Sequence, residues 1–157
     1  MAAPSAVRRL LLATGFLVLV QAGVGLVINL YGLFPVHHRG SRAGAHRMRA
    51  YESFAWAVGH GTVALAVHTA LGLTLVLLSI VAAVRAVLLR QRAVAFWTVL
   101  GALLVIGAAV FGGSFLAHGK TLDSLLMALF ALSAELCFHL AVDLLPSGRH
   151  GPVATLR

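Results

Sequence analysis

Three ionisable side chains repeat at four-residue intervals near the carboxyl end of the chain: Glu135, His139 and Asp143. Four residues advance an α-helix by about 400°, so the three side chains share one face of a helix. A carboxyl and an imidazole one turn apart can exchange a proton, which is the chemistry of a relay. The surrounding residues are apolar, and polar groups at membrane depth are costly and commonly functional. The pattern predicts either a proton relay or a hydrogen-bonded pair that satisfies itself against neighbouring helices.

Histidine is the second chemical feature, with 8 histidines beside only 4 acidic residues. Imidazole is a common axial ligand of haem, and a b-type haem between helices needs two imidazoles at similar depth. His60 and His118 meet that condition, because each lies at the same edge of an apolar segment. His68 follows His60 by eight residues, which is about 12 Å along a helix and roughly on the same face. These three histidines are the candidate ligands of haem b, which is the cofactor that the sequence suggests.

Other chemistry has little support. A divalent metal held by His37, His38 or His46 with His60 is disfavoured, because four arginines in the same segment repel a cation. No metalloprotease motif, nucleophile elbow or phosphate-binding loop is present. The lone Cys137 lies in an apolar run and has no partner for an internal disulfide, so we expect a small core residue. The sequence therefore predicts no metal ligand and no catalytic residue.

A stripe of small and amide side chains repeats near the amino end, at Gln21, Gly25 and Asn29. Small residues let helices approach closely in a membrane, and amides form hydrogen bonds between helices. We expect this stripe to serve helix packing. Gly101 and Gly112 predict a second close-packing helix further along the chain.

The elements that must position these residues are membrane spans. The chain has 157 residues, of which 61% are hydrophobic and 10% charged, which excludes a soluble globular protein. About 20 apolar residues cross a bilayer, and four segments reach that length: 10–33, 54–84, 93–117 and 124–145. Backbone groups in lipid must be satisfied within the segment, so we expect helices. The prediction is an all-α, antiparallel four-helix bundle forming a single membrane domain, with Pro35 ending the first span.

The net charge of +8 does not indicate nucleic acid, because the basic residues fall in short blocks between apolar spans. Such blocks set topology and meet anionic lipid headgroups. With the amino terminus inside, seven Lys and Arg lie on the inner side and five on the outer. The positive-inside rule therefore favours cytoplasmic termini in a bacterial inner membrane. Tyr31, Tyr51 and Trp56 would then form an outer aromatic belt.

The first span also has features of a signal peptide. Two arginines, an apolar run and Val20-Gln21-Ala22 resemble a secretory signal with its cleavage site. The apolar run continues to Phe34, which is too long for a typical signal core. The intact mass of the purified protein decides between a first membrane span and a cleaved signal peptide, because loss of residues 1–22 would leave three spans.

Several stretches resemble a group of small four-span membrane proteins from high-GC actinobacteria. They are the run 29–38 (NLYGLFPVHH), Trp56, the His60 and His68 pair, and 111–116 (FGGSFL) with 124–128. That resemblance implies an inner-membrane, four-helix architecture and no particular chemistry. The stretch 21–26 (QAGVGL) and the four-helix plan are similar to half of a haem A synthase-like bundle, in which His60 is the position carried over as a ligand.

Three functions follow from these observations. The first is a non-enzymatic accessory or scaffold component that packs against a membrane-protein partner or a second copy through Gly/Ala-rich faces. The second is a single-haem electron-transfer or haem-handling protein. The third is a proton-coupled carrier or channel in which Glu135 and His139 titrate. In each case the bilayer is a partner and nucleic acid is not.

Overall fold

The computed structural model describes residues 4–31 and 46–146, with side chains in the second range from Tyr51 onward. These ranges form five helices and no strand: α1 (Pro4–Tyr31), α2 (His46–His60), α3 (Val63–Leu88), α4 (Arg92–His118) and α5 (Thr121–Asp143). Four of them, α1, α3, α4 and α5, are long and apolar enough to cross a membrane. The predicted all-α, four-helix membrane architecture is confirmed. His37, His38 and Pro35 lie outside the described residues, as does the side chain of His46.

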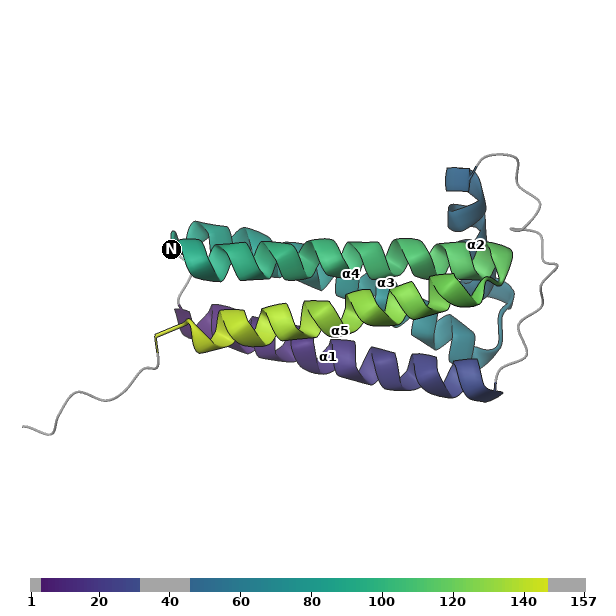
Figure 1. The fold of residues 1–157 in the computed structure, drawn as a ribbon, viewed down its shortest axis with the longest axis horizontal. Coiled ribbons are helices and arrows are strands. Elements are labelled where there is room, and N and C mark those ends of the chain that lie inside the picture. The colour runs from purple at the N-terminus through teal and green to yellow at the C-terminus, as the bar shows by residue number, and fades with distance from the viewer. Residues whose placement is uncertain (1–3, 32–45, 147–157) are drawn as a thin grey trace, which may run out of the picture.

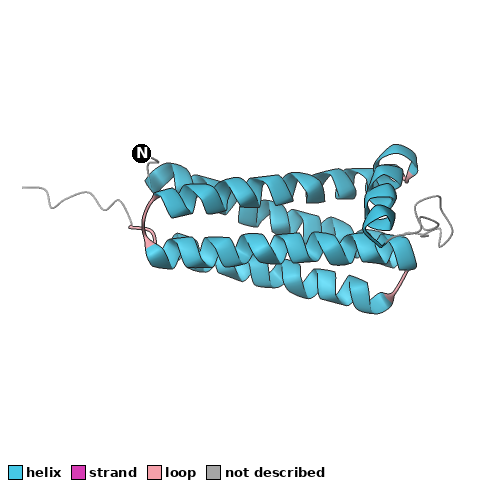
Figure 2. Cartoon of the chain, turned by 90° about the horizontal axis from the view of Figure 1, so that it is seen from above, coloured by secondary structure: helices cyan, strands magenta, loops and turns pink. Residues whose placement is uncertain are grey.

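The four long helices run side by side (Figure 1, Figure 2). Both α1 and α4 contact α3 and α5, so the helices form a ring in the order α1, α3, α4, α5. The short helix α2 crosses one end of the bundle, where it contacts α3 and α4. We call this the loop end. The opposite end, where α1 begins and α5 finishes, is the terminal end.

The second span differs from the predicted range 54–84. Residues up to His60 belong to α2, and the span itself begins at Val63. Thr62 caps α3, because its hydroxyl accepts a hydrogen bond from the Leu65 N–H at 3.3 Å. A Cβ at Gly61 would lie 2.5 Å from the carbonyl oxygen of Ala57, so only glycine fits this turn. These two residues divide one apolar stretch into two helices.

The remaining helix ends follow local chemistry. The helix α1 begins at Pro4, earlier than the predicted residue 10, because proline is favoured in a first turn where its missing N–H is not needed. Gly119 ends α4 with φ 67°, the left-handed conformation typical of a helix C-cap. Ser114 and Asp123 then join α4 to α5, since the serine hydroxyl donates to the carboxylate at 2.7 Å.

The largest fully buried side chains of the described residues lie at the terminal end. Val7 and Leu11 from α1 and Phe138 from α5 are almost completely buried there, together with Val94 at the start of α4. A Cβ at Gly101 would lie 2.8 Å from the Phe138 ring, so this glycine of α4 admits the aromatic side chain of α5. The predicted close packing of this helix is therefore confirmed. Cys137 is buried beside Phe138 and forms no disulfide, as expected.

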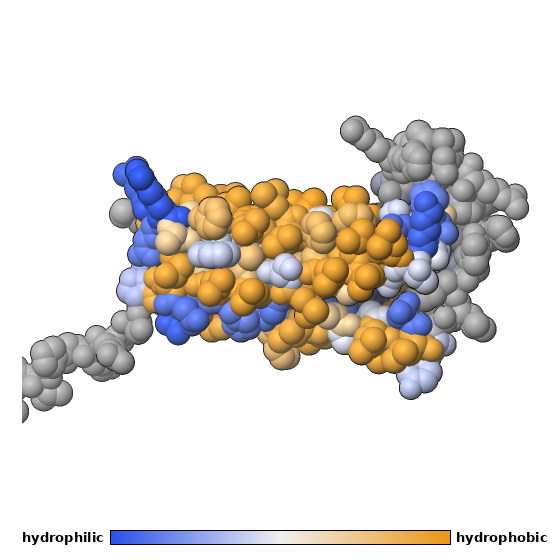
Figure 3. Space-filling model, viewed as in Figure 1, coloured by the Kyte–Doolittle hydropathy of each residue, from blue (hydrophilic) through white to orange (hydrophobic). Residues whose placement is uncertain are grey.

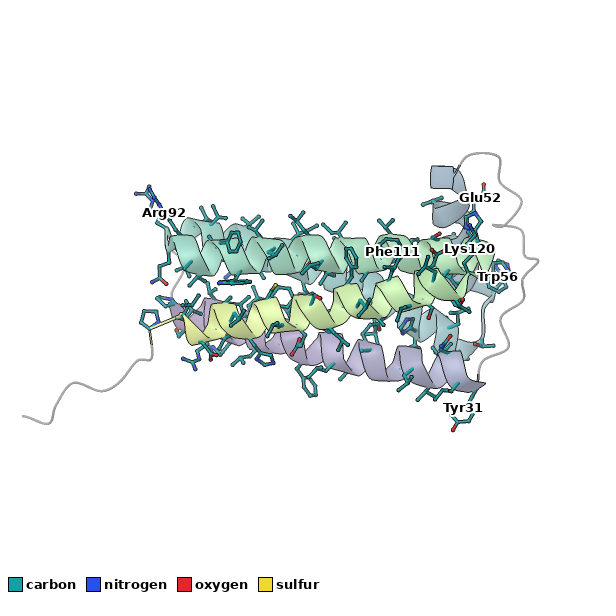
Figure 4. The ribbon with its side chains drawn as sticks, in the orientation of Figure 1. Tyr31, Glu52, Trp56, Arg92, Phe111 and Lys120 are labelled. Carbon is teal, nitrogen blue, oxygen red and sulfur yellow. The ribbon has the colours of Figure 1, made fainter. Side chains whose placement is uncertain are left out.

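The surface has the character of a membrane protein. Apolar side chains cover the sides of the bundle, while hydrophilic residues gather towards its two ends (Figure 3). Tyr31 and Trp56 both lie at the loop end, and Arg92 lies at the terminal end (Figure 4). The helices therefore present an apolar band to lipid between two polar edges.

Candidate functional site

A cavity of about 470 Å³ lies between the helices towards the loop end. All four long helices line it, and α2 contributes Phe54. Small-molecule sites occupy roughly 300–1,000 Å³ and are mostly apolar with few polar groups, and this cavity has that character. Leu26, Leu73 and Leu132 line it and are also exposed on the outside of the bundle, so the cavity reaches the lipid-facing surface.

Small residues on three of the helices are part of the cavity lining. Gly25 on α1, Gly72 on α3 and both Ala108 and Gly112 on α4 line the cavity. The helices α1 and α5 meet where Glu135 packs on Gly15, and they separate towards the loop end (Figure 1). The bundle is therefore closed by large side chains at the terminal end and hollow at the loop end.

Gln21 and His68 are two of the polar residues that line the cavity, together with Asn29, Thr69 and Ser124. The Gln21 side-chain N–H donates to the backbone carbonyl of His68 at 2.8 Å, which links α1 to α3. Gln21 Oε1 and His68 Nδ1 are both buried and have no hydrogen-bond partner among the described residues. Leaving such a buried group unpaired costs about 1–3 kcal/mol. Both atoms have almost no accessible surface, so a group in the cavity would contact them only after these side chains shift.

The His68 ring is held against the backbone of α1. A Cβ at Gly25 would lie 2.8 Å from Cε1 of His68 and 3.5 Å from its Nε2. A Cβ at Gly72 would lie 3.1 Å from the Gln21 amide nitrogen. Each polar side chain thus packs over a glycine of the opposite helix, so the predicted packing stripe at Gln21 and Gly25 does contact a neighbouring helix. Asn29, its third member, is exposed and also lines the cavity.

The other two histidines predicted as haem ligands lie apart from this cavity. His60 is exposed at the last residue of α2, and His118 ends α4 with its Nδ1 at 3.0 Å from the Ser114 carbonyl oxygen. Neither lines the cavity, and His68 is the one histidine among the described residues that does. The cavity therefore does not present the paired imidazoles that a bis-histidine haem requires.

Glu135 forms a second site, between α5 and α1. Its carboxyl packs on the α1 backbone, since a Cβ at Gly15 would lie 2.9 Å from Oε2 and 3.2 Å from Oε1. His139 Nε2 lies 2.7 Å from Glu135 Oε1, the contact expected from their spacing. That contact lacks the alignment of a hydrogen bond, so both carboxyl oxygens are buried without a donor among the described residues. The Glu135 side chain is 9% exposed and that of His139 is 56% exposed.

This arrangement forms a stripe of ionisable groups from the protein interior to its terminal end. Asp143, the last residue of α5, is exposed and completes it. Ala131 lines the cavity one turn before Glu135, and Val18 lines it about one turn after Gly15. The buried carboxyl therefore lies about one helical turn beyond the wall of the cavity. Whether it relays protons stays a prediction.

Sequence reasoning missed the cavity and the part that His68 plays in it. The signal that could have found them is the four-residue step from His68 to Gly72, which matches the step from Gln21 to Gly25. Matched polar and small residues on two spans indicate a pair of helices in contact. No group of three metal-ligating side chains occurs in the described ranges. Comparison of the chain with protein-family models, curated proteins and solved structures finds no match.

Proposed function

We propose that this chain is a non-enzymatic membrane protein that binds a lipid-soluble small molecule between its helices, as a carrier or as the ligand-holding component of a membrane complex. The observation that carries the proposal is the largely apolar cavity of about 470 Å³ between the four long helices. A molecule drawn from the bilayer would fill this apolar space. The opening beside Leu26 and Leu132 gives it a route from lipid.

The location that fits this role is the cytoplasmic membrane of a bacterium, with both termini in the cytoplasm. The larger number of Lys and Arg on that side supports this orientation. The likeness to small four-span actinobacterial proteins supports the same location. In this orientation the cavity lies in the outer half of the bilayer.

A cavity-filling variant tests the proposal. Ala108→Phe on α4 would place a phenyl ring in the cavity, whereas Leu103→Phe places the same ring on the lipid-facing surface of the same helix. Native mass spectrometry of the protein released from lipid nanodiscs would show a bound small molecule in the wild type and in Leu103→Phe, and none in Ala108→Phe. Equal occupancy in all three proteins would contradict the proposal.

A second candidate function is proton-coupled transport of that molecule. It rests on the buried Glu135 carboxyl, in contact with a more exposed imidazole of the same stripe. Glu135→Gln keeps the shape of the side chain and removes its titration, so it should abolish the pH dependence of flux into liposomes. Asp143→Asn, at the exposed end of the stripe, is the matched control. Unchanged pH dependence in Glu135→Gln would discard this function.

The haem alternative is tested by a visible absorption spectrum before and after reduction with dithionite. A Soret band that His60→Ala removes would support it. If protein purified from haem-sufficient cells shows no Soret band, the haem alternative is discarded and a lipid-soluble molecule stays the proposed ligand.

A further inference from the structure

We propose that the ligand is a linear acyl chain of a membrane lipid, which lies in the cavity parallel to the helices with its polar head at the loop end. The inference rests on the proposed ligand-binding function and names the class of ligand. It follows from the length and volume of the cavity, the order of polar and apolar residues along it, and its opening to the lipid-facing surface.

The cavity runs along the bundle. Its lining residues fall within 18–29 of α1, 65–75 of α3, 105–116 of α4 and 124–132 of α5. At about 1.5 Å for each helical residue, these stretches are about 12–16 Å long. One leaflet contributes about 15 Å of hydrocarbon, half of a core roughly 30 Å thick. The cavity therefore matches the length of lipid chain that one leaflet holds.

The volume of the cavity is that of a single chain. An extended chain of single bonds advances about 1.2 Å per bond, so a length of about 12–16 Å corresponds to about 10–13 carbon atoms. At about 30 Å³ for each group of the size of a water molecule, 470 Å³ holds on the order of 15 such groups. The two values agree to within a few methylene groups. Two chains side by side would need about twice this volume.

The lining changes from partly polar to apolar along the cavity. Nearest the loop end it includes Asn29 on α1 and Ser124 on α5. At the opposite limit the last lining residue of each long helix is apolar: Val18, Leu75, Val105 and Leu132. The loop end can therefore accommodate a polar head, and the deeper part a hydrocarbon chain. A lipid of the leaflet at the loop end already has this orientation in the bilayer.

The cavity is open to the side and closed towards the terminal end. Leu26 on α1 and Leu132 on α5 line it and are exposed, so a chain can enter from the bilayer beside them. Beyond Val18, the packing of Glu135 on Gly15 brings α5 against α1 and closes the space. One chain therefore ends inside the bundle, and a second chain of the same lipid stays in the bilayer.

Two alcohols with equal numbers of carbon atoms test the shape of the ligand. In nanodiscs holding the same mole fraction of each, 1-dodecanol should bind the wild type about tenfold more tightly than cyclododecanol, by native mass spectrometry, because the ring is wider than one chain. Leu103→Phe should keep this preference, and Ala108→Phe should bind neither alcohol. Equal or tighter binding of cyclododecanol to the wild type would overturn the linear-chain assignment and leave the ligand-binding function standing.

Photoreactive phospholipids test the orientation. A diazirine near the carboxyl end of one dodecanoyl chain should label Ile28 and Leu65, whereas a diazirine near its methyl end should label Val18 and Val105. All four residues are buried, so lipid outside the bundle does not reach them. The reverse order of labelling would overturn the orientation. Equal labelling of these residues in the wild type and in Ala108→Phe would overturn the ligand-binding function as well.

The mass of the lipid that co-purifies with the wild type distinguishes the source of the chain. A phospholipid supplies one of its two chains, and a fatty acid or lysolipid supplies its single chain. A bound molecule without a linear hydrocarbon chain would contradict the acyl-chain assignment while supporting the ligand-binding function.

Discussion

The most informative perturbation is a single methyl group added to α1 at Gly25 or at Gly23. A Cβ at Gly25 would lie 2.8 Å from Cε1 of His68, about 0.6 Å closer than an ordinary 3.4 Å contact, whereas a Cβ at Gly23 would meet nothing within 4 Å. Both variants gain about 1 kcal/mol of helix propensity, which cancels in their comparison. Overpacking costs about 1–3 kcal/mol. We therefore expect Gly25→Ala to be less stable than Gly23→Ala by about 1–3 kcal/mol.

Unfolding by sodium dodecyl sulfate in mixed micelles measures this difference, and occupancy of the cavity by 1-dodecanol measures its consequence. Gly25→Ala must displace the His68 ring, which lines the cavity, so we expect the affinity for the probe to fall about tenfold. Gly23 also lines the cavity, but its added methyl would meet nothing within 4 Å and would leave His68 in place, so Gly23→Ala should lower the affinity less. Equal stability and equal binding of the two variants would refute the packing of His68 on α1.

Three further predictions concern stability. Glu135→Leu should stabilise the protein by about 1 kcal/mol or more in the same assay, because an apolar side chain avoids the cost of burying the carboxyl, and its close neighbour His139 is 56% exposed and can be solvated instead; a loss of stability would mean that the contact with His139 is structural. Gly119→Ala should destabilise by about 1 kcal/mol, since its φ of 67° is unfavourable for alanine, and an unchanged midpoint would contradict that conformation. Ser114→Ala should cost about 1–2 kcal/mol through loss of the 2.7 Å hydrogen bond to Asp123, and Asp123→Asn should lose less because an amide oxygen can still accept.

Much of the fold could be predicted from the sequence, because a membrane restricts long apolar segments to helices. The division of the second span was not predicted. Its residues are apolar on both sides of the break, and the local signal is confined to Gly61 and Thr62. Hydropathy over a long window does not resolve so short a break.

The candidate sites, like the fold, could be predicted from the sequence only in part. The contact between Glu135 and His139 follows from helical spacing within one helix, so the sequence predicted it. The cavity depends on how α1 and α3 are rotated about their axes, which spacing within either helix does not determine. His60 and His118 were chosen for depth alone, and the structure places them at helix ends while the more deeply placed His68 lines the cavity.

The most direct test of the ligand-binding account is the ¹⁵N spectrum of histidine-labelled protein in bilayers, recorded with and without 1-dodecanol. The account predicts that the ring ¹⁵N resonances of His68, assigned through His68→Gln, shift when the alcohol is added, because His68 lines the cavity, while the resonances of His60, His118 and His139 stay in place. The same spectrum of Ala108→Phe should not change. His68 resonances that are unmoved by saturating alcohol would contradict the claim that this cavity binds a lipid-soluble molecule.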